Sequence, residues 1–275
     1  MDSKALFWQL DQAESRQLQR WESWIKAVER SIPWREMERL DKASGTQLSK
    51  LALLPEFQVN ITGLGKIMAD HGAEMIGAGM AHGDLLVAEL HKKYRPRKLA
   101  DLPGWDPEKA TPTPEEAISV MERRSLVLSG DVGLQMEADI KKTMVEYLIG
   151  TSRDETESRI VDLLQDTQER ASLITTTEST YAYNRGRLVS FKENDVDYVR
   201  FSAIRDGRTS EQCNSRHGLI MRLDDPRLAD NTPPLHGRCR SVLDPLYSEY
   251  QPEMLTKENQ DWSKVVALPK GWRAA

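Results

Sequence analysis

The chain has 275 residues, of which 39% are hydrophobic and 29% are charged, and its formal net charge at pH 7 is -5. This composition is typical of a folded protein with one large or two ordinary domains, and it excludes a largely disordered chain. The acidic balance also argues against a dedicated duplex-binding protein, which would carry a basic surplus.

The number of cysteines and the lengths of the apolar runs indicate the cellular compartment in which the chain is made. Two cysteines do not make a disulfide framework, and the first ten residues lack the basic start and long apolar run of a signal peptide. We therefore expect synthesis in a reducing cytoplasm. The most apolar stretch, residues 61–90, is interrupted by charged side chains and histidines, so no segment offers about 20 uninterrupted apolar residues. No membrane association is predicted.

The first 94 residues read as helices. Apolar side chains recur at spacings of three and four from Phe7 to Ile32, which predicts a long amphipathic helix ended by Pro33. Four of the seven tryptophans lie here, which favours their burial in the domain, with a partner surface as the alternative. A second helix is expected over residues 64–94, where glycines permit a close neighbour or a kink. Residues 1–94 are predicted to be a helical N-terminal domain.

A change of composition follows. Repeated prolines in residues 95–112 exclude a long helix or a central strand, and we interpret this segment as an interdomain linker. Helices resume where Thr113 can act as the cap, Pro114 suits the first helical position and Glu116 completes a capping box. Further apolar stripes predict mostly helix up to about residue 192.

The last third of the chain mixes helix and strand. The tract LITTTESTYAYNRGRL, residues 173–188, has three consecutive threonines typical of a strand, but its apolar spacing favours a helix. Strands are expected at 198–204, 219–223 and 241–245. We therefore predict an α+β fold, with a mostly helical N-terminal part followed by a small antiparallel sheet around a loop-rich Cys/His module. This second domain is assigned to residues 113–245.

Residues 246–275 are assigned to a C-terminal tail. The tail carries Trp262, Val265, Val266 and Trp272 among charged residues and prolines. Such a segment either orders on a partner or lies back on the domain, and the sequence leaves both open.

The stretch from Asp206 to Pro245 contains both cysteines and two of the five histidines. Cys213 and His217 are separated by three residues and His236 and Cys239 by two, so the four can close a tetrahedral Cys2His2 site that suits zinc. One alternative is buried thiols with hydrogen-bonded histidines. The other is a Cys213–Cys239 disulfide, which a reducing cytoplasm disfavours and a released particle permits.

Several short motifs follow one another in a fixed order over residues 155–245. They are TESTYAYNRGR at 177–187, then Asp206, Arg208, Thr209 and Cys213, then Gly218, and finally Pro233, Pro234 and His236 with Cys239 and Arg240. This order resembles the phage Mu F-like minor head protein (head morphogenesis) family. Members of that family often have Cys where this chain has Ser210 and Ser241, and Pro where it has Gly237. These departures remove two thiols, which leaves a vacant ligand place for His217.

The resemblance implies a structural protein present in few copies in the head of a tailed phage, needed for head assembly or DNA delivery. The implied partners are the portal protein and the major capsid protein, with DNA contact as a further option. The implied location is the virion, with the host cytoplasm during assembly. The resemblance implies no catalytic residue, so we do not expect an enzyme.

Two alternatives follow from the residues themselves. Asp206, Arg208 and Thr209 are interpreted as a turn held by polar contacts, whereas Arg208, Arg238 and Arg240 converging on a phosphate would be the functional alternative. The competing function is a metal-dependent hydrolase or nuclease, in which three ligands hold zinc, an open position activates water and Asp206 is the general base.

Overall fold

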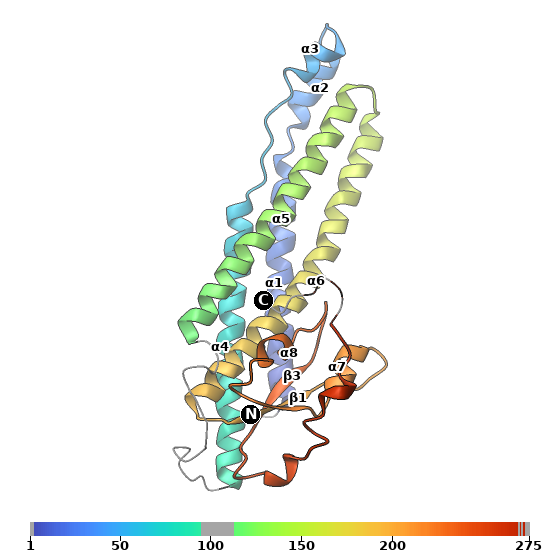
Figure 1. Cartoon of the computed structure of the whole chain (residues 1–275). Coiled ribbons are helices and arrows are strands. Elements are labelled where there is room, and N and C mark those ends of the chain that lie inside the picture. The colour runs from blue at the N-terminus through green and yellow to red at the C-terminus, as the bar shows by residue number, and fades with distance from the viewer. Residues whose placement is uncertain (1–2, 95–112, 269, 271, 273–275) are drawn as a thin grey trace. The chain divides into compact units, whose positions relative to one another are not determined.

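The computed structural model describes residues 3–94, 113–268, 270 and 272 (Figure 1). The segment 95–112, which the sequence predicts to be a linker, lies outside the described residues. Among the described residues, no helix combines the length and apolar character needed to cross a membrane. The elements are α1 (Ser3–Ser31), α2 (Trp34–Lys42), α3 (Gln47–Leu51), α4 (Ile61–Lys93), α5 (Pro114–Leu148), α6 (Arg153–Glu193), β1 (Tyr198–Ser202), α7 (Glu211–Arg216), β2 (Ile220–Arg222), α8 (Leu228–Asn231), β3 (Val242–Leu246), η2 (Pro252–Met254) and η3 (Trp262–Lys264).

The predicted α+β fold is confirmed, because long helices precede a three-stranded antiparallel sheet. The ambiguous threonine-rich tract lies inside α6 and is helical, as its apolar spacing predicts. At the start of α5 the capping box is present: the Thr113 N–H donates to Glu116 Oε2 at 2.8 Å, and the Glu116 N–H donates to Thr113 Oγ1 at 3.3 Å.

The chain divides into two compact units, each assembled from separated segments. Of the described residues, unit 1 comprises those within Met1–Glu14, His71–Met121 and Leu173–Ala275, and unit 2 comprises those within Ser15–Asp70 and Glu122–Ser172. The sequence-based boundaries at residues 94, 113 and 245 stay a prediction, because compactness does not show which part folds alone.

Unit 2 is a helical body with buried aromatic rings. Trp21 and Trp24 are buried and meet edge to face with ring centroids 6.0 Å apart. The Trp24 indole N–H donates to the Asn60 carbonyl at 2.9 Å, which satisfies its polar edge. The Val59 N–H donates to Glu137 Oε2 at 2.9 Å and fixes the chain entering α4. For these two tryptophans, the expected burial within the domain is confirmed.

Unit 1 contains a close crossing of α4 and α6. A Cβ added to Gly79 would lie 2.1 Å from the Tyr183 carbonyl oxygen, and one added to Gly186 would lie 2.1 Å from the Ile76 carbonyl oxygen. Each backbone therefore occupies the space that a side chain on the other helix would need. Of the two sequence-based alternatives for the glycine-rich helix, close approach to a neighbour is the one observed.

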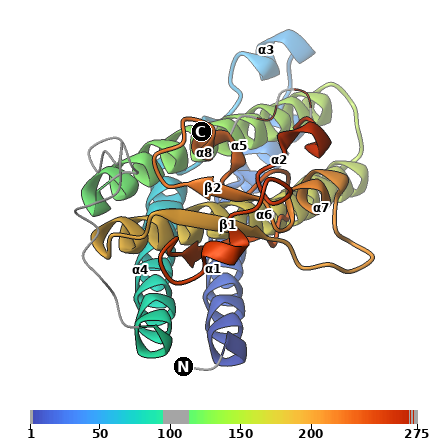
Figure 2. The same ribbon diagram turned by 60° about the horizontal axis from the view of Figure 1, so that its bottom comes forward.

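The sheet has the order β2-β1-β3 and lies beside the second half of α6 (Figure 2). Val199 pairs with Met221 on one side of β1, and Phe201 pairs with Leu243 on the other. These four side chains are buried in one core cluster with both cysteines. The three strands lie within one or two residues of their predicted positions.

Both outer edges of the sheet are covered. The Asn184 side chain of α6 donates to the Ser241 carbonyl at 3.2 Å and accepts from the Leu243 N–H at 3.2 Å, on the outer side of β3. On the outer side of β2, the Ile220 N–H donates to the Asn259 carbonyl at 2.8 Å. Unpaired strand edges invite association with other chains, so these contacts protect the sheet.

The described part of the C-terminal tail lies back on unit 1. Trp262, Val265 and Leu268 pack against the core cluster around the sheet. The guanidinium of Arg227 lies 4.0 Å from the centroid of the Trp262 ring, and the Trp272 indole N–H donates to the Pro234 carbonyl at 3.2 Å. Of the two alternatives for the tail, this is the second.

Candidate metal centre

Cys213 is presented by the short helix α7. The Ser210 side chain caps this helix by accepting the Cys213 N–H at 3.2 Å. Cys213 is 2% exposed, so its sulfur faces the interior of unit 1. The loop that precedes α7 follows directly from strand β1, which anchors this half of the site.

His236 and Cys239 are presented by the loop between α8 and β3, after the cis Pro233–Pro234 bond. Two threonines of α6 hold this loop. The Thr180 hydroxyl donates to the Cys239 carbonyl at 2.6 Å, and Thr177 Oγ1 accepts the Arg238 N–H at 3.1 Å. Both contacts are to backbone groups next to the sulfur ligand, so α6 fixes the position of Cys239.

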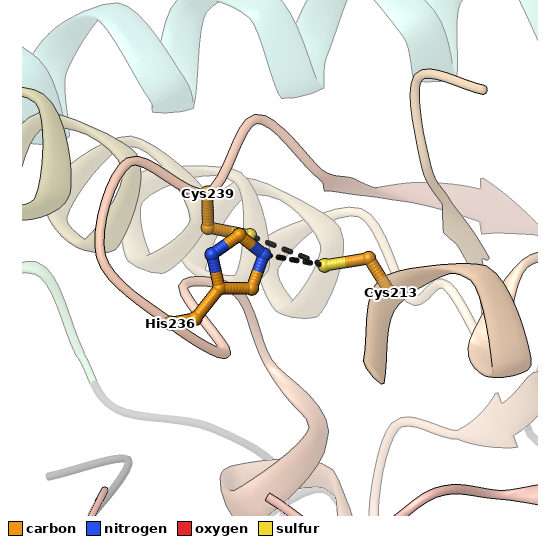
Figure 3. A group of neighbouring side chains, drawn as sticks. All are labelled: Cys213, His236 and Cys239. Atoms are coloured by element: carbon orange, nitrogen blue, oxygen red, sulfur yellow. Dashed lines mark hydrogen bonds between the residues drawn. The ribbon is translucent and has the colours of Figure 1, made fainter. Parts of the chain in front are cut away.

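Cys213, His236 and Cys239 point toward one another (Figure 3). The Cys213 sulfur lies 3.2 Å from His236 Nε2 and 3.6 Å from the Cys239 sulfur, and all three ligand atoms lie within 4.8 Å of one another. Two sulfurs bound to one tetrahedral zinc at about 2.3 Å would lie about 3.8 Å apart. The observed spacing therefore fits a zinc ion at the centre of the group.

In its neutral form, His236 has the tautomer that a ligand needs. His236 Nδ1 lies 2.8 Å from the Gly237 carbonyl, to which it donates its hydrogen, and this leaves Nε2 directed at the sulfurs. A histidine ligand usually donates its second ring N–H to such an acceptor, which fixes the orientation of the ring. The Gly237 carbonyl is therefore an outer partner of the candidate centre.

The electrostatics favour one thiolate in the metal-free chain. The hydrogen bond from the Cys239 thiol lowers the pKa of Cys213, burial opposes this with a smaller effect, and the hydrogen bond from His236 lowers the pKa further. The same hydrogen bond, together with burial, raises the pKa of Cys239. The pKa of His236 is also raised, first by its hydrogen bond with Cys213. Both shifts favour the proton on Cys239 and the thiolate on Cys213, and a thiolate is the form that binds a cation.

Residues 135–244 match the family model described as Phage Mu protein F like protein. This region of the chain is Mu F-like. The resemblance drawn from the motifs is confirmed over these residues, and the family is one of phage head morphogenesis proteins. No curated protein and no solved structure matches the chain.

His217 does not join the three candidate ligands in the Mu F-like region. It follows the last residue of α7, and its Nδ1 accepts the Ala203 N–H at 3.2 Å. Of the four residues that the sequence offers as a Cys2His2 set, the structure thus brings three together. The spacing from Cys213 to His217 suits a ligand pair, but this ring is engaged with the backbone after β1.

The other motif residues form the surrounding loops. Asp206 receives two hydrogen bonds from Arg240, both at 2.9 Å, and Arg208 lies 3.8 Å away. Thr209 Oγ1 accepts the Asp206 N–H at 2.9 Å. Hydrogen bonds from the Arg208 N–H and from Arg240 lower the pKa of Asp206. Gly218, with φ +86, allows the turn into β2.

Sequence reasoning missed the residues that position the centre. Thr177 and Thr180 lie in the TESTYAYNRGR motif, but nothing in their spacing shows that they hold the Cys239 loop. Arg216 is 4% exposed, and its side chain donates to Asn231 Oδ1 at 2.7 Å and to the Val266 carbonyl at 2.8 Å. This arginine ties α7 to α8 and to the C-terminal tail.

Proposed function

We propose that the protein is a minor head protein of a tailed phage that acts in head morphogenesis by docking on the portal or the inner capsid surface. The observation that carries the proposal is the Mu F-like match over residues 135–244, which includes all of α6, strands β1 and β2, the start of β3 and the candidate metal group. The proposed role of the protein is binding. The same proposal includes delivery of the DNA and contact with it.

The position of Asp206 weakens the competing hydrolase. That mechanism needs a carboxylate free to take a proton from water. Asp206 instead accepts two hydrogen bonds from Arg240, and its lowered pKa makes it a poorer base. Metal-dependent cleavage of DNA that is lost in Asp206→Asn would support the hydrolase hypothesis.

The deciding measurement is the copy number in purified, DNA-filled particles of the source phage, by quantitative mass spectrometry relative to the portal subunit. A few copies per particle are expected. Absence from the particle, or a copy number equal to that of the major capsid protein, would contradict a minor head component. Binding of the purified chain to isolated portal and to empty capsids then distinguishes the two docking surfaces.

The docking test uses the full chain. Deleting residues 1–94 would remove Val87, Met75 and Ile76, which α4 contributes to the core clusters of unit 1. Loss of binding by such a truncation would therefore report unfolding as readily as a lost docking surface.

We further propose that Cys213, His236 and Cys239 hold zinc as a structural tie between α7 and the loop before β3. Support comes from the ligand spacing, the histidine tautomer and the small size of the module, for which metal binding adds directly to folding free energy. Elemental analysis of protein purified without chelator should find one zinc per chain.

Two histidine variants form a matched pair for the zinc site. His236→Ala should weaken zinc binding by more than roughly 100-fold, because even an outer partner of a ligand is worth about 10- to 100-fold. His217→Ala keeps all three ligands and should leave zinc affinity within about twofold, since its ring bonds to Ala203. Equal losses in the two variants would restore the four-ligand set and contradict the three-ligand site.

A further inference from the structure

We infer that Cys213 and Cys239 form a redox modification site, in which loss of the metal lets the two thiols close into a disulfide. The inference rests on the proposed zinc site, because it makes zinc and the disulfide two alternative states of the same sulfur pair. It adds a covalent chemistry that the head-protein function does not require.

The geometry brings the two sulfurs together before any bond is formed. Both cysteines are free, their sulfurs are 3.6 Å apart, and the side chains are directed at each other (Figure 3). A disulfide needs a sulfur–sulfur distance of about 2.05 Å, so the two must approach by roughly 1.5 Å. Cys213 stands on α7, which has only six residues, so a small shift of one short helix brings the sulfurs together.

The chain offers no competing thiol. The sequence contains two cysteines, so an intramolecular disulfide can join only Cys213 and Cys239. Their sulfurs are buried in the core of unit 1, which favours small oxidants over bulky ones. Zinc withdraws electron density from a thiolate that it binds and makes the sulfur a weaker nucleophile, so the metal protects both cysteines until it leaves.

Peroxide is the oxidant class that fits this buried pair. One cysteine thiolate attacks the O–O bond of hydrogen peroxide, its sulfur becomes a sulfenic acid, and hydroxide leaves and takes up the thiol proton. The second thiol attacks the sulfenic sulfur, the S–S bond forms, and water leaves. The two thiols are oxidised by two electrons in total, and one peroxide is reduced to two waters.

The passage of the protein from the cell to the outside provides conditions under which the disulfide can form. A virion component is made in a reducing cytoplasm and then leaves the cell, where disulfides persist. The tie between α7 and the loop of Cys239 would thus survive loss of zinc, with a covalent bond in place of the metal. The same two structural elements are held together in both states.

The test exposes zinc-loaded and chelator-stripped full-length protein to dilute hydrogen peroxide. In the stripped protein we expect a loss of two hydrogens in the intact mass, a cross-linked peptide that joins Cys213 and Cys239, and loss of zinc uptake that reductant restores. In the zinc-loaded protein the same change should be at least about tenfold slower. Cys239→Ser is the control: it should form sulfenic acid on Cys213 and no cross-link.

The outcomes separate the two proposals. If the reduced protein takes up no zinc, the proposed zinc site is wrong. The proposed replacement of zinc by a disulfide is then also refuted. If zinc binds but the stripped, oxidised chain keeps two free thiols or stops at higher acids on separate cysteines, the disulfide is refuted and the zinc site stands. An oxidised, cross-linked chain that still binds one zinc would also refute the exchange.

Discussion

The close crossing of α4 and α6 predicts that a single added methyl group lowers the stability of the protein. In Gly79→Ala, the new Cβ would meet the Tyr183 carbonyl oxygen at 2.1 Å and the Arg187 nitrogen at 3.1 Å. These are backbone atoms and cannot rotate away, so the helices must separate by about 1.3 Å to reach an ordinary contact near 3.4 Å. Overpacking of this kind costs about 1–3 kcal/mol, and the better helix propensity of alanine returns about 1 kcal/mol.

Gly77→Ala on the same helix is the matched control. A Cβ there meets nothing within 4 Å, so only the propensity gain remains and the variant should be more stable by about 1 kcal/mol. The difference between the two variants cancels propensity and isolates the clash, which we expect to be about 3 kcal/mol at the upper end of that range.

Guanidinium unfolding followed by far-UV circular dichroism measures this difference. The midpoint should fall for Gly79→Ala and rise for Gly77→Ala, with similar slopes in both variants. Two variants of equal stability would show that the helices do not approach as closely as the structure has them. Gly186→Ala meets the Ile76 carbonyl oxygen at 2.1 Å and should reproduce the Gly79→Ala result from the other helix.

Two further predictions concern polar groups of unit 1. Burial, and then the charge of Arg187, lower the pKa of His82 from 6.5 to about 4. The unfolded chain therefore binds this proton at a pH where the folded chain does not, so stability should fall by about 1–2 kcal/mol as pH drops from 6.5 to 4, allowing for partial exposure. His82→Gln should flatten that part of the profile of urea midpoint against pH, and an unchanged slope would count against a half-buried neutral histidine. Asn184→Leu leaves the Ser241 carbonyl and the Leu243 N–H without their side-chain partner and should cost about 2–4 kcal/mol, which thermal unfolding would show; a loss below about 0.5 kcal/mol would mean that water replaces the amide.

Local signals in the sequence account for what could be predicted. The capping box at Thr113 and Glu116 depends on residues three apart, and it is present in the structure. The helical form of residues 173–188 follows from apolar spacing, which here outweighs the strand preference of three threonines. Features of this kind depend on residues that lie within one or two helical turns of each other in the sequence.

The composition of the candidate site depended on distant pairs and was predicted only in part. Cys213, His236 and Cys239 come together because two loops meet, and their spacing in the sequence allowed this without requiring it. His217 has an equally suitable spacing, but the Ala203 N–H, 14 residues earlier, takes its Nδ1. A long-range backbone partner of this sort leaves no periodic signal, so sequence spacing could not separate the ligand from its neighbour.

The motifs that mark the Mu F-like region make contacts with one another in the folded chain. Thr180 of the α6 motif bonds to the carbonyl of Cys239, Asp206 bonds to Arg240, and the Cys213 sulfur meets His236. Segments far apart in the chain are thus joined in pairs around a single core. A signature made of mutual contacts specifies how the module folds. A catalytic signature would instead gather groups left free to act on a substrate. The ordered motifs therefore account for how the Mu F-like region folds.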